Sequence, residues 1–240
     1  MRTRRPWIAL LLATALVAAG QGAWAQEAGI TFGPEGSLSL RTVQLIALLT
    51  VLSLAPGIAV TITCFPFIVT VLSIMRQAIG LQAAPPNMLI VSLAMFLTYF
   101  VMEPVVTAAW EVGIGPLTRG ELEAGAALSA AAEPFRAFMA ARVDPDTLAH
   151  LQDLRPDSPP GALPVLIPSF LLSEISRAFQ IGFLVFMPFL IIDMVAAAVL
   201  MSMGMMMVPP AIVSLPFKLA FFVVVDGWTL VTGALVRSYL

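Results

Sequence analysis

The residues that could do chemistry here are three charged side chains in an almost wholly apolar stretch, residues 177–237. Only Asp193, Lys218 and Asp226 carry charge inside it. An ionisable group at mid-membrane costs about 3 kcal/mol on insertion scales, so such groups usually face protein or a water-filled path. Asp193 and Lys218 lie at nearly equal distances in sequence on either side of Met205, so antiparallel arms would bring the opposite charges level.

These positions make the three residues candidates for assembly or gating. We predict that Asp193 and Lys218 pair, either within one hairpin or between neighbouring copies. The alternative is that Lys218 snorkels to the interface and Asp193 points into water. Asp226 follows Lys218 by a spacing that turns it about 80° round a helix, so we expect it to face a different, unnamed partner.

The chain has few residues that could carry out other kinds of chemistry. One histidine and one cysteine leave no basis for a metal cluster or a Cys/His catalytic pair. There is no glycine-rich loop ending in Lys-Ser/Thr for a nucleotide. Cys64 lies in an apolar run and is expected to be a buried thiol, and His150 is expected on a solvated helix face. We therefore expect no metal, no cofactor and no enzymatic activity.

The composition is that of an integral membrane or membrane-complex protein. The 240 residues are 60% hydrophobic and 11% charged, whereas soluble domains average about 25% charged residues. The net charge of -2 and the lack of a basic run give no reason to expect nucleic acid as a partner.

The hairpin that must position the charges is expected over residues 169–240. Each arm exceeds the roughly 20 apolar residues that cross a membrane. Gly204 and the pair Pro209-Pro210 should break the helix between the arms, because proline cannot continue the hydrogen-bond ladder. Before the hairpin, Glu174 and Arg177 stand at i, i+3; Glu174 either contacts a neighbouring subunit or completes a surface pair.

The N-terminus, residues 1–25, has the pattern of a cleavable signal peptide. Three arginines precede an apolar core, and Ala23-Trp24-Ala25 matches the small-x-small cleavage pattern, so cleavage is expected between Ala25 and Gln26. The competing interpretation is an uncleaved anchor helix. Residues 26–42 would form a short leader.

Residues 43–110 are expected to form a first helical hairpin pair. Pro56-Gly57 and Pro66 interrupt its first apolar run, which favours a broken or hairpin-like element. In the loop that follows, Arg76 ends the run and is a candidate subunit contact, Gly80 should stop a helix, and Pro85-Pro86-Asn87 should begin the next.

Residues 111–168 are the only soluble-like stretch and should form a small helical extracytoplasmic segment. A helix is expected over residues 122–141, and residues 157–161 should be a turn. The predicted fold is therefore an all-α membrane-complex protein. It has four long apolar helical elements arranged as hairpins, with this segment between the second and the third.

Several motifs in order resemble the FliP family, the P subunit of the bacterial flagellar type III export gate. The similarity covers roughly residues 45–236, and Leu81 and Ala83 depart from the polar residues usual in the family. The residues that carry it are Arg76, Gly80, Pro85-Pro86-Asn87, Phe100-Val101-Met102, Pro104-Val105, Gly204-Met205-Met206-Met207-Val208-Pro209-Pro210, Leu215-Pro216-Phe217-Lys218-Leu219 and Asp226-Gly227-Trp228.

The resemblance implies a pore-forming subunit in the inner membrane, within the flagellar basal body, for export of unfolded flagellar proteins. Copies would form a pentameric ring with the Q, R and B subunits of the gate, and much of the ring would sit at periplasmic level although hydropathy favours a multi-pass protein. Met205, Met206 and Met207 match the family's methionine loop, a gasket around the closed pore; polarisable, unbranched side chains suit this role. The other interpretation of these methionines is loop or core filler.

Three alternatives remain at this point. The equivalent subunit of a virulence injectisome would share these motifs, although the signal peptide and the extracytoplasmic segment favour the flagellar branch. A secondary transporter could use the three charges as a coupling site, but no internal repeat of the apolar elements is visible. A membrane enzyme would need a nucleophile-base pair or metal ligands at useful spacing, which we do not find.

Overall fold

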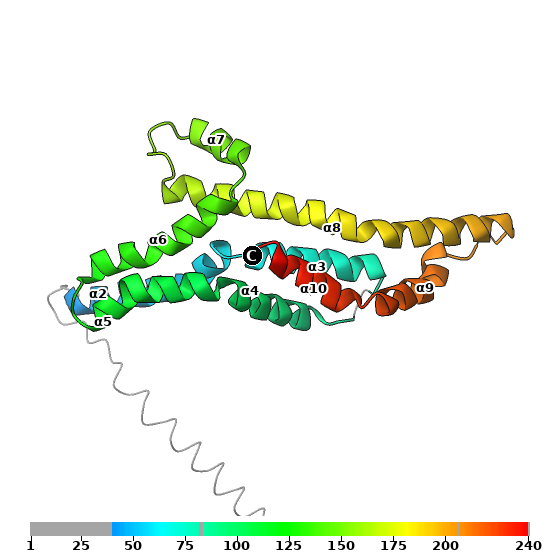
Figure 1. Ribbon diagram of the computed structural model, residues 1–240, viewed down its shortest axis with the longest axis horizontal. Coiled ribbons are helices and arrows are strands. Elements are labelled where there is room, and N and C mark those ends of the chain that lie inside the picture. The colour runs from blue at the N-terminus through cyan, green and yellow to red at the C-terminus, as the bar shows by residue number, and fades with distance from the viewer. Residues whose placement is uncertain (1–39, 82–83, 206, 240) are drawn as a thin grey trace, which may run out of the picture. The chain divides into compact units, whose positions relative to one another are not determined.

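The fold is all-α, as the sequence predicts. The computed structural model describes residues 40–81, 84–205 and 207–239, and these contain helices and no strands (Figure 1). The chain divides into two compact units, Met1–Ser53 and Leu54–Leu240. Helix α2 (Leu40–Thr61) begins in the first unit and ends in the second. All the interactions below lie within the second unit.

Helix α3 (Phe65–Ile79) is the centre of the core and packs along α8 (Leu163–Ser202). One face of α3 is fully buried, and the two helices approach closely at Gly182. A Cβ atom on Gly182 would lie 2.4 Å from Ile74 Cδ1 and 3.1 Å from Ile74 Cγ2, so a larger residue would force the Ile74 side chain to move. The buried residues of α3 are Phe67, Ile68, Val71, Leu72, Met75, Ala78 and Ile79.

Helix α8 is one 40-residue helix that runs through Pro168 and Pro188. The predicted boundary between residues 168 and 169 is therefore inside a helix, which begins at Leu163. A proline removes one ladder hydrogen bond, but neighbouring turns and packing can keep an apolar helix continuous. The same holds for Pro56 inside α2, so the first apolar run breaks at residues 62–64 and not at Pro56.

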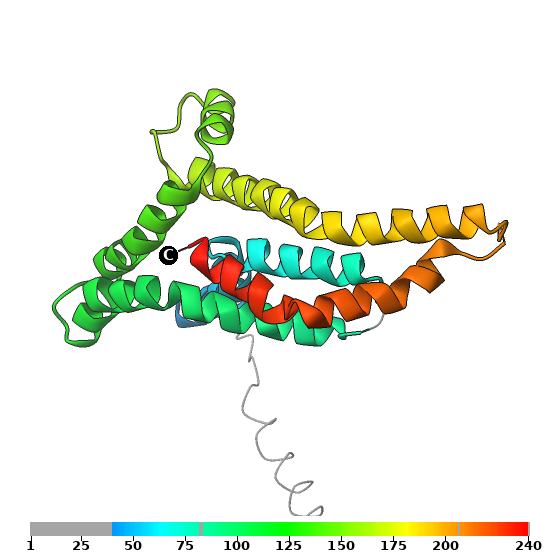
Figure 2. The same cartoon turned by 45° about the vertical axis from the view of Figure 1, so that its right-hand side comes forward.

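The second arm of the hairpin is bent. Helices α9 (Pro210–Val224) and α10 (Gly227–Arg237) meet at 60°, as the red end of the chain shows in Figure 2. Asp226 adopts the left-handed conformation at the bend, with φ 48°. Gly227 follows because a Cβ atom there would lie 2.1 Å from the Phe222 ring. The expectation of a single membrane-length second arm is corrected by this break.

Helix α4 (Asn87–Ala109) continues into a π-helical turn, η1 (Trp110–Ile114), and α5 (Gly115–Thr118). Within the described residues, Asn87–Thr118 and Leu163–Ser202 are long and apolar enough to cross a membrane, and the bent pair α9–α10 could be a third span. The expected number of four long elements is thus not confirmed.

The polar segment holds α6 (Ala124–Arg142) and α7 (Pro145–Asp153). The helix predicted over residues 122–141 corresponds to α6, shifted by a residue or two. Helix α7 carries His150, which is exposed on it, in agreement with the expected solvated helix face. Its N-cap is Asp144, whose carboxylate accepts hydrogen bonds from the Thr147 backbone N–H at 2.9 Å and the Thr147 hydroxyl at 2.8 Å.

Candidate functional site

The structure pairs Asp193 and Lys218 across the hairpin of one chain. Lys218 Nζ lies 2.5 Å from Asp193 Oδ2, and the Ser214 hydroxyl donates to Asp193 Oδ1 at 2.5 Å. Asp193 comes from α8, and its two partners come from α9. The Lys218 side chain is 7% exposed and that of Asp193 is 31% exposed. A nearly buried ammonium therefore depends on this carboxylate, which keeps part of its surface open.

Asp226 lies apart from this pair in its own setting. It is exposed at the bend between α9 and α10, and it forms no ion pair within the described part of the chain. The expectation that it faces something other than Lys218 agrees with this position. Its backbone N–H donates to the Val223 carbonyl at 3.1 Å, so the residue's local role is to turn the chain.

The methionine-rich turn joins α8 to α9 at the far end of the hairpin (Figure 1). Gly204 adopts φ 76°, and the backbone N–H of Met205 donates to the Leu200 carbonyl at 3.0 Å, which ends α8. Met205 is 43% exposed and Met207 is 97% exposed. Two predicted gasket side chains thus point away from the chain's own core; Met206 lies outside the described residues.

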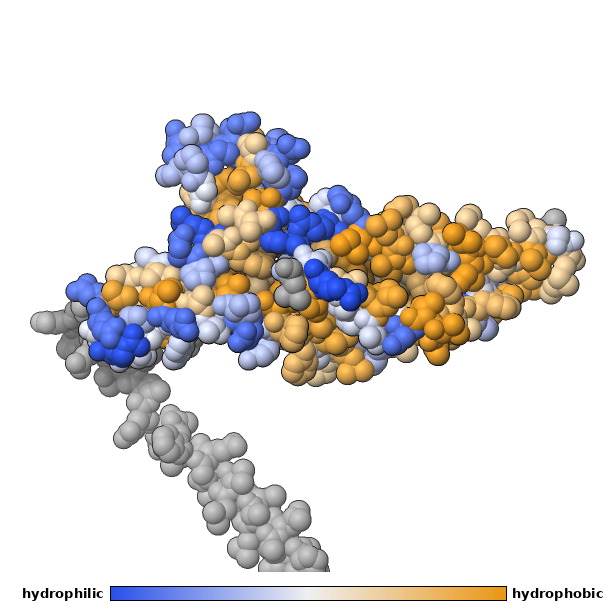
Figure 3. Space-filling model, viewed as in Figure 1, coloured by the Kyte–Doolittle hydropathy of each residue, from blue (hydrophilic) through white to orange (hydrophobic). Residues whose placement is uncertain are grey.

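The second unit has hydrophilic and hydrophobic surfaces over different helices. Figure 3 shows a hydrophilic surface over α7 and a mainly hydrophobic one over α9 and the second half of α8. On α8, Phe179, Phe183 and Leu184 are 60%, 61% and 67% exposed. Uncovered apolar area of this kind marks contact with lipid or with other protein.

The loop before α4 is held by Arg76. Its Nη1 donates to the Pro85 carbonyl at 3.3 Å and to the Asn87 side-chain oxygen. Gly80 ends α3 in the left-handed conformation with φ 89°, and α4 begins at Asn87 after Pro86. The structure therefore brings most of this loop motif together inside one chain. The predicted cleavage site, Ala25 and Gln26, lies outside the described residues.

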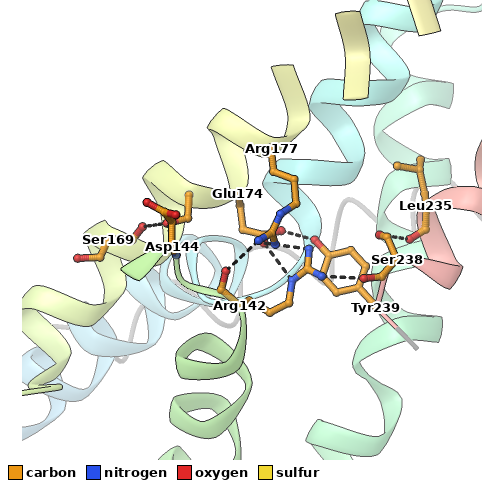
Figure 4. A network of polar contacts seen from close by, with 9 residues as sticks. Arg142, Asp144, Ser169, Glu174, Arg177, Leu235, Ser238 and Tyr239 are labelled. Carbon is orange, nitrogen blue, oxygen red and sulfur yellow. Dashed lines mark hydrogen bonds and ion pairs between the residues drawn. The ribbon is translucent and has the colours of Figure 1, made fainter. Parts of the chain in front are cut away.

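A second charged group surrounds Glu174, where α6, α8 and the residues after α10 meet (Figure 4). The Glu174 side chain has 0% exposure. Its Oε1 accepts from Arg142 Nε and from Arg177 Nη1, each at 3.2 Å. Its Oε2 accepts from the Tyr239 hydroxyl. The i, i+3 pair with Arg177 is present, but the carboxylate is enclosed, so neither a subunit contact nor a surface pair describes Glu174.

Arg142 and Tyr239 are the members of this group that sequence reasoning missed. They lie 32 and 65 residues from Glu174, so helical spacing gives no sign of them. Arg142 Nη1 also donates to the Ser238 carbonyl at 2.7 Å, and its guanidinium lies 3.9 Å from the centre of the Tyr239 ring. The one available signal was a tyrosine directly after an apolar helix, which alone indicates only an interfacial position.

Within the described ranges, the structure gives no indication of a metal site or of a reactive thiol. No group of three or more His, Cys, Asp or Glu residues there could hold a metal ion. Cys64 has 0% exposure, as predicted for a buried thiol. Burial raises the pKa of this thiol to about 12, which removes its nucleophilic form at neutral pH.

Comparison with known proteins gives one consistent result. The model of the FliP family matches residues 48–235. A flagellar biosynthetic protein FliP from Caulobacter vibrioides is 49% identical over 97% of this chain and 90% of its own length. Proteins of the same name from Pectobacterium carotovorum and Bacillus subtilis are 43% and 44% identical, over 95% and 82% of this chain and 92% of their own lengths.

Proposed function

This chain belongs to the FliP family, and we propose that it is a core pore-forming subunit of the flagellar protein export gate. The family match across residues 48–235 carries this proposal, because it spans both hairpins and the segment between them. The relatives that match are named flagellar biosynthetic proteins. Those names support a flagellar role over the equivalent subunit of a virulence injectisome.

The chain would act by assembly and not by catalysis. Copies would form a ring, pentameric by resemblance to the family, together with the Q, R and B subunits of the gate, and unfolded flagellar proteins would pass through its centre. The exposed apolar surface of α8 supports such packing, since lipid or protein must cover it. The apolar helices suit the bacterial inner membrane, and part of the ring would sit at periplasmic level.

The methionine turn would form the gasket of the closed pore. Its support is the position of Met205 and Met207 at a tight turn, where both side chains are exposed and Met207 almost fully so. A ring of such side chains could fill a gap against ions and still yield to varied passing chains. Replacing Met205, Met206 and Met207 by alanine should raise ion leak through assembled gates, and unchanged leak would reject the gasket.

The decisive experiment is a clean deletion of the gene in its host. The culture medium would be assayed for hook and filament proteins, and swimming would be scored. Loss of both, restored by the intact gene, is the expected result. Normal secretion and swimming would reject the flagellar role, and an effector-delivery assay would then test the injectisome alternative.

A further inference from the structure

The two residues after α10, Ser238 and Tyr239, contact side chains of three helices, α3, α6 and α8. The Tyr239 ring lies edge-on to Phe67 of α3, with centroids 5.5 Å apart, and stacks on Phe138 of α6 at 6.1 Å. Its hydroxyl reaches Glu174 of α8. Helix α10 packs against α4 and α9, and its Val231 and Leu235 belong to the same hydrophobic core as the buried face of α3. Ser238 and Tyr239 thus add contacts at α3, α6 and α8 to those that α9 makes with α8 and α3.

The hydrogen bond from Tyr239 to Glu174 requires the phenol to stay protonated and neutral. Burial, followed by the neighbouring Glu174 carboxylate, raises the pKa of Tyr239 above its ordinary value, so the phenol keeps its proton. The wholly buried Glu174 has Arg142 and Arg177 on its other oxygen. Without the phenol, one carboxylate oxygen would lose its only partner among the described residues, which is costly for a buried charge.

We propose that Ser238 and Tyr239 form a strap that closes over the N-terminal end of α3 and fastens the bent arm α9–α10 to the α6–α8 junction. Two hydrogen bonds hold the strap closed. The Tyr239 hydroxyl donates to Glu174, and Arg142 Nη1 donates to the Ser238 carbonyl at 2.7 Å. When the strap is open, the arm keeps the contacts of α9 with α8 and of α10 with α4, and it loses its contact with α6. The strap is a contact within one chain, so it does not depend on what the assembly exports.

Cys64 lies next to the residues that the strap covers, so we expect the strap to contribute to its burial, and the thiol provides a native probe. Cys64 precedes α3 by one residue, and Phe67, one turn further, is the residue under the Tyr239 ring. The thiol is fully buried, with its pKa raised to about 12 by burial. Opening the strap would admit water to this end of α3, so both access to the thiol and its thiolate fraction should rise.

The test measures alkylation of Cys64 by a membrane-permeant maleimide at pH 8, with the full chain in native membranes. We expect slow labelling of the unaltered chain and labelling about tenfold faster in Tyr239→Phe, because a hydrogen bond to a buried charge is lost. Tyr239→Ala should label faster still. Tyr99→Phe is the matched control, since it removes the other tyrosine hydroxyl of the chain at a side chain that is 68% exposed. Ser238→Ala should also label slowly, since its hydroxyl bonds only the Leu235 carbonyl.

Two further readings separate strap opening from general unfolding. Labelling in denaturant sets the rate for a fully open chain, and Tyr239→Phe should remain well below it. Hydrogen exchange over Phe65–Ile79 should stay slow beyond the first turn of α3, while exchange at the end of α10 rises. Labelling of both Tyr239 variants at the rate of the unaltered chain would overturn the strap. Equal acceleration in Tyr99→Phe, or loss of protection throughout α3 in Tyr239→Phe, would overturn it as well.

Discussion

Glu174 and Asp193 are acidic residues on the same helix, α8, but their surroundings differ. Glu174 has no exposed side-chain area and is bonded by groups from three parts of the chain. The Asp193 side chain is 31% exposed, and its partners among the described residues all come from α9. The first half of α8 packs against α3, α6 and α7 around Glu174. The second half has α9 as its main cover and presents a hydrophobic surface (Figure 3).

The difference indicates separate tasks for the two acids. The oxygens of Glu174 are all used inside the chain, so it can stabilise the fold but cannot recognise another molecule. Asp193 is held by Ser214 and Lys218 and still presents surface. A neighbouring subunit in an assembled ring could reach it. A role in assembly or gating therefore remains a proposal for Asp193 and Lys218, while the Glu174 group belongs to folding.

The largest effect is expected for Glu174→Gln. It leaves two arginines around an uncharged amide, and breaking a buried ion pair by removing one partner costs about 3–5 kcal/mol. The variant chain should fail to accumulate in membranes, or should unfold at a much lower temperature in detergent. Glu133→Gln is the control, because that carboxylate lies 3.8 Å from Arg136 with 69% of its side chain exposed. Equal stability of the two variants would contradict the assignment of Glu174 to the fold.

A smaller loss is expected when the Asp193–Lys218 pair is broken. Asp193→Asn or Lys218→Met should cost about 2 kcal/mol, because a charged hydrogen bond is lost beside a partly open carboxylate. The charge-swapped double variant, Asp193→Lys with Lys218→Asp, should recover part of the accumulation and secretion lost in Asp193→Lys or Lys218→Asp alone. A swap that rescues neither would mean that the 2.5 Å contact contributes little in the membrane.

Asp193 and Glu174 also show which contacts can be predicted from the sequence and which cannot. Asp193 and Lys218 were paired from their symmetry about the turn, because two antiparallel helices of equal rise bring such positions level. The partners of Glu174 depend on how α6 and the residues after α10 dock on α8, and no local spacing encodes that docking. The break between α9 and α10 was missed for a similar reason. Both sides of Asp226 are apolar enough to be taken for one arm, and the bend becomes evident only from the contact between Gly227 and Phe222.

Near the Glu174 group, the N-cap of α7 should give a moderate local effect. Asp144→Ala removes two hydrogen bonds to Thr147, so amides in α7 should exchange about fivefold faster, with little change in α8. The same bonds hold the pKa of Asp144 below its usual range. Its stabilisation is therefore complete above the ordinary aspartate pKa and is lost as pH falls through the lower folded value. At that acid pH, the protection of α7 amides in the unaltered chain, measured relative to the intrinsic exchange rate at the same pH, should fall to that of the variant.

The smallest effect is expected at the exposed ion pair between Arg119 and Glu121. Arg119 Nε lies 2.6 Å from Glu121 Oε1, as close as Lys218 lies to Asp193, but the two side chains are 58% and 55% exposed. Water screens such pairs, and ordering two long side chains offsets the attraction. Arg119→Ala should leave the unfolding temperature and secretion unchanged within error, at low and at high salt. A clear loss of stability would mean that separation alone, and not burial, sets the strength of ion pairs in this chain, and the contrast between Glu174 and Asp193 would lose its physical basis.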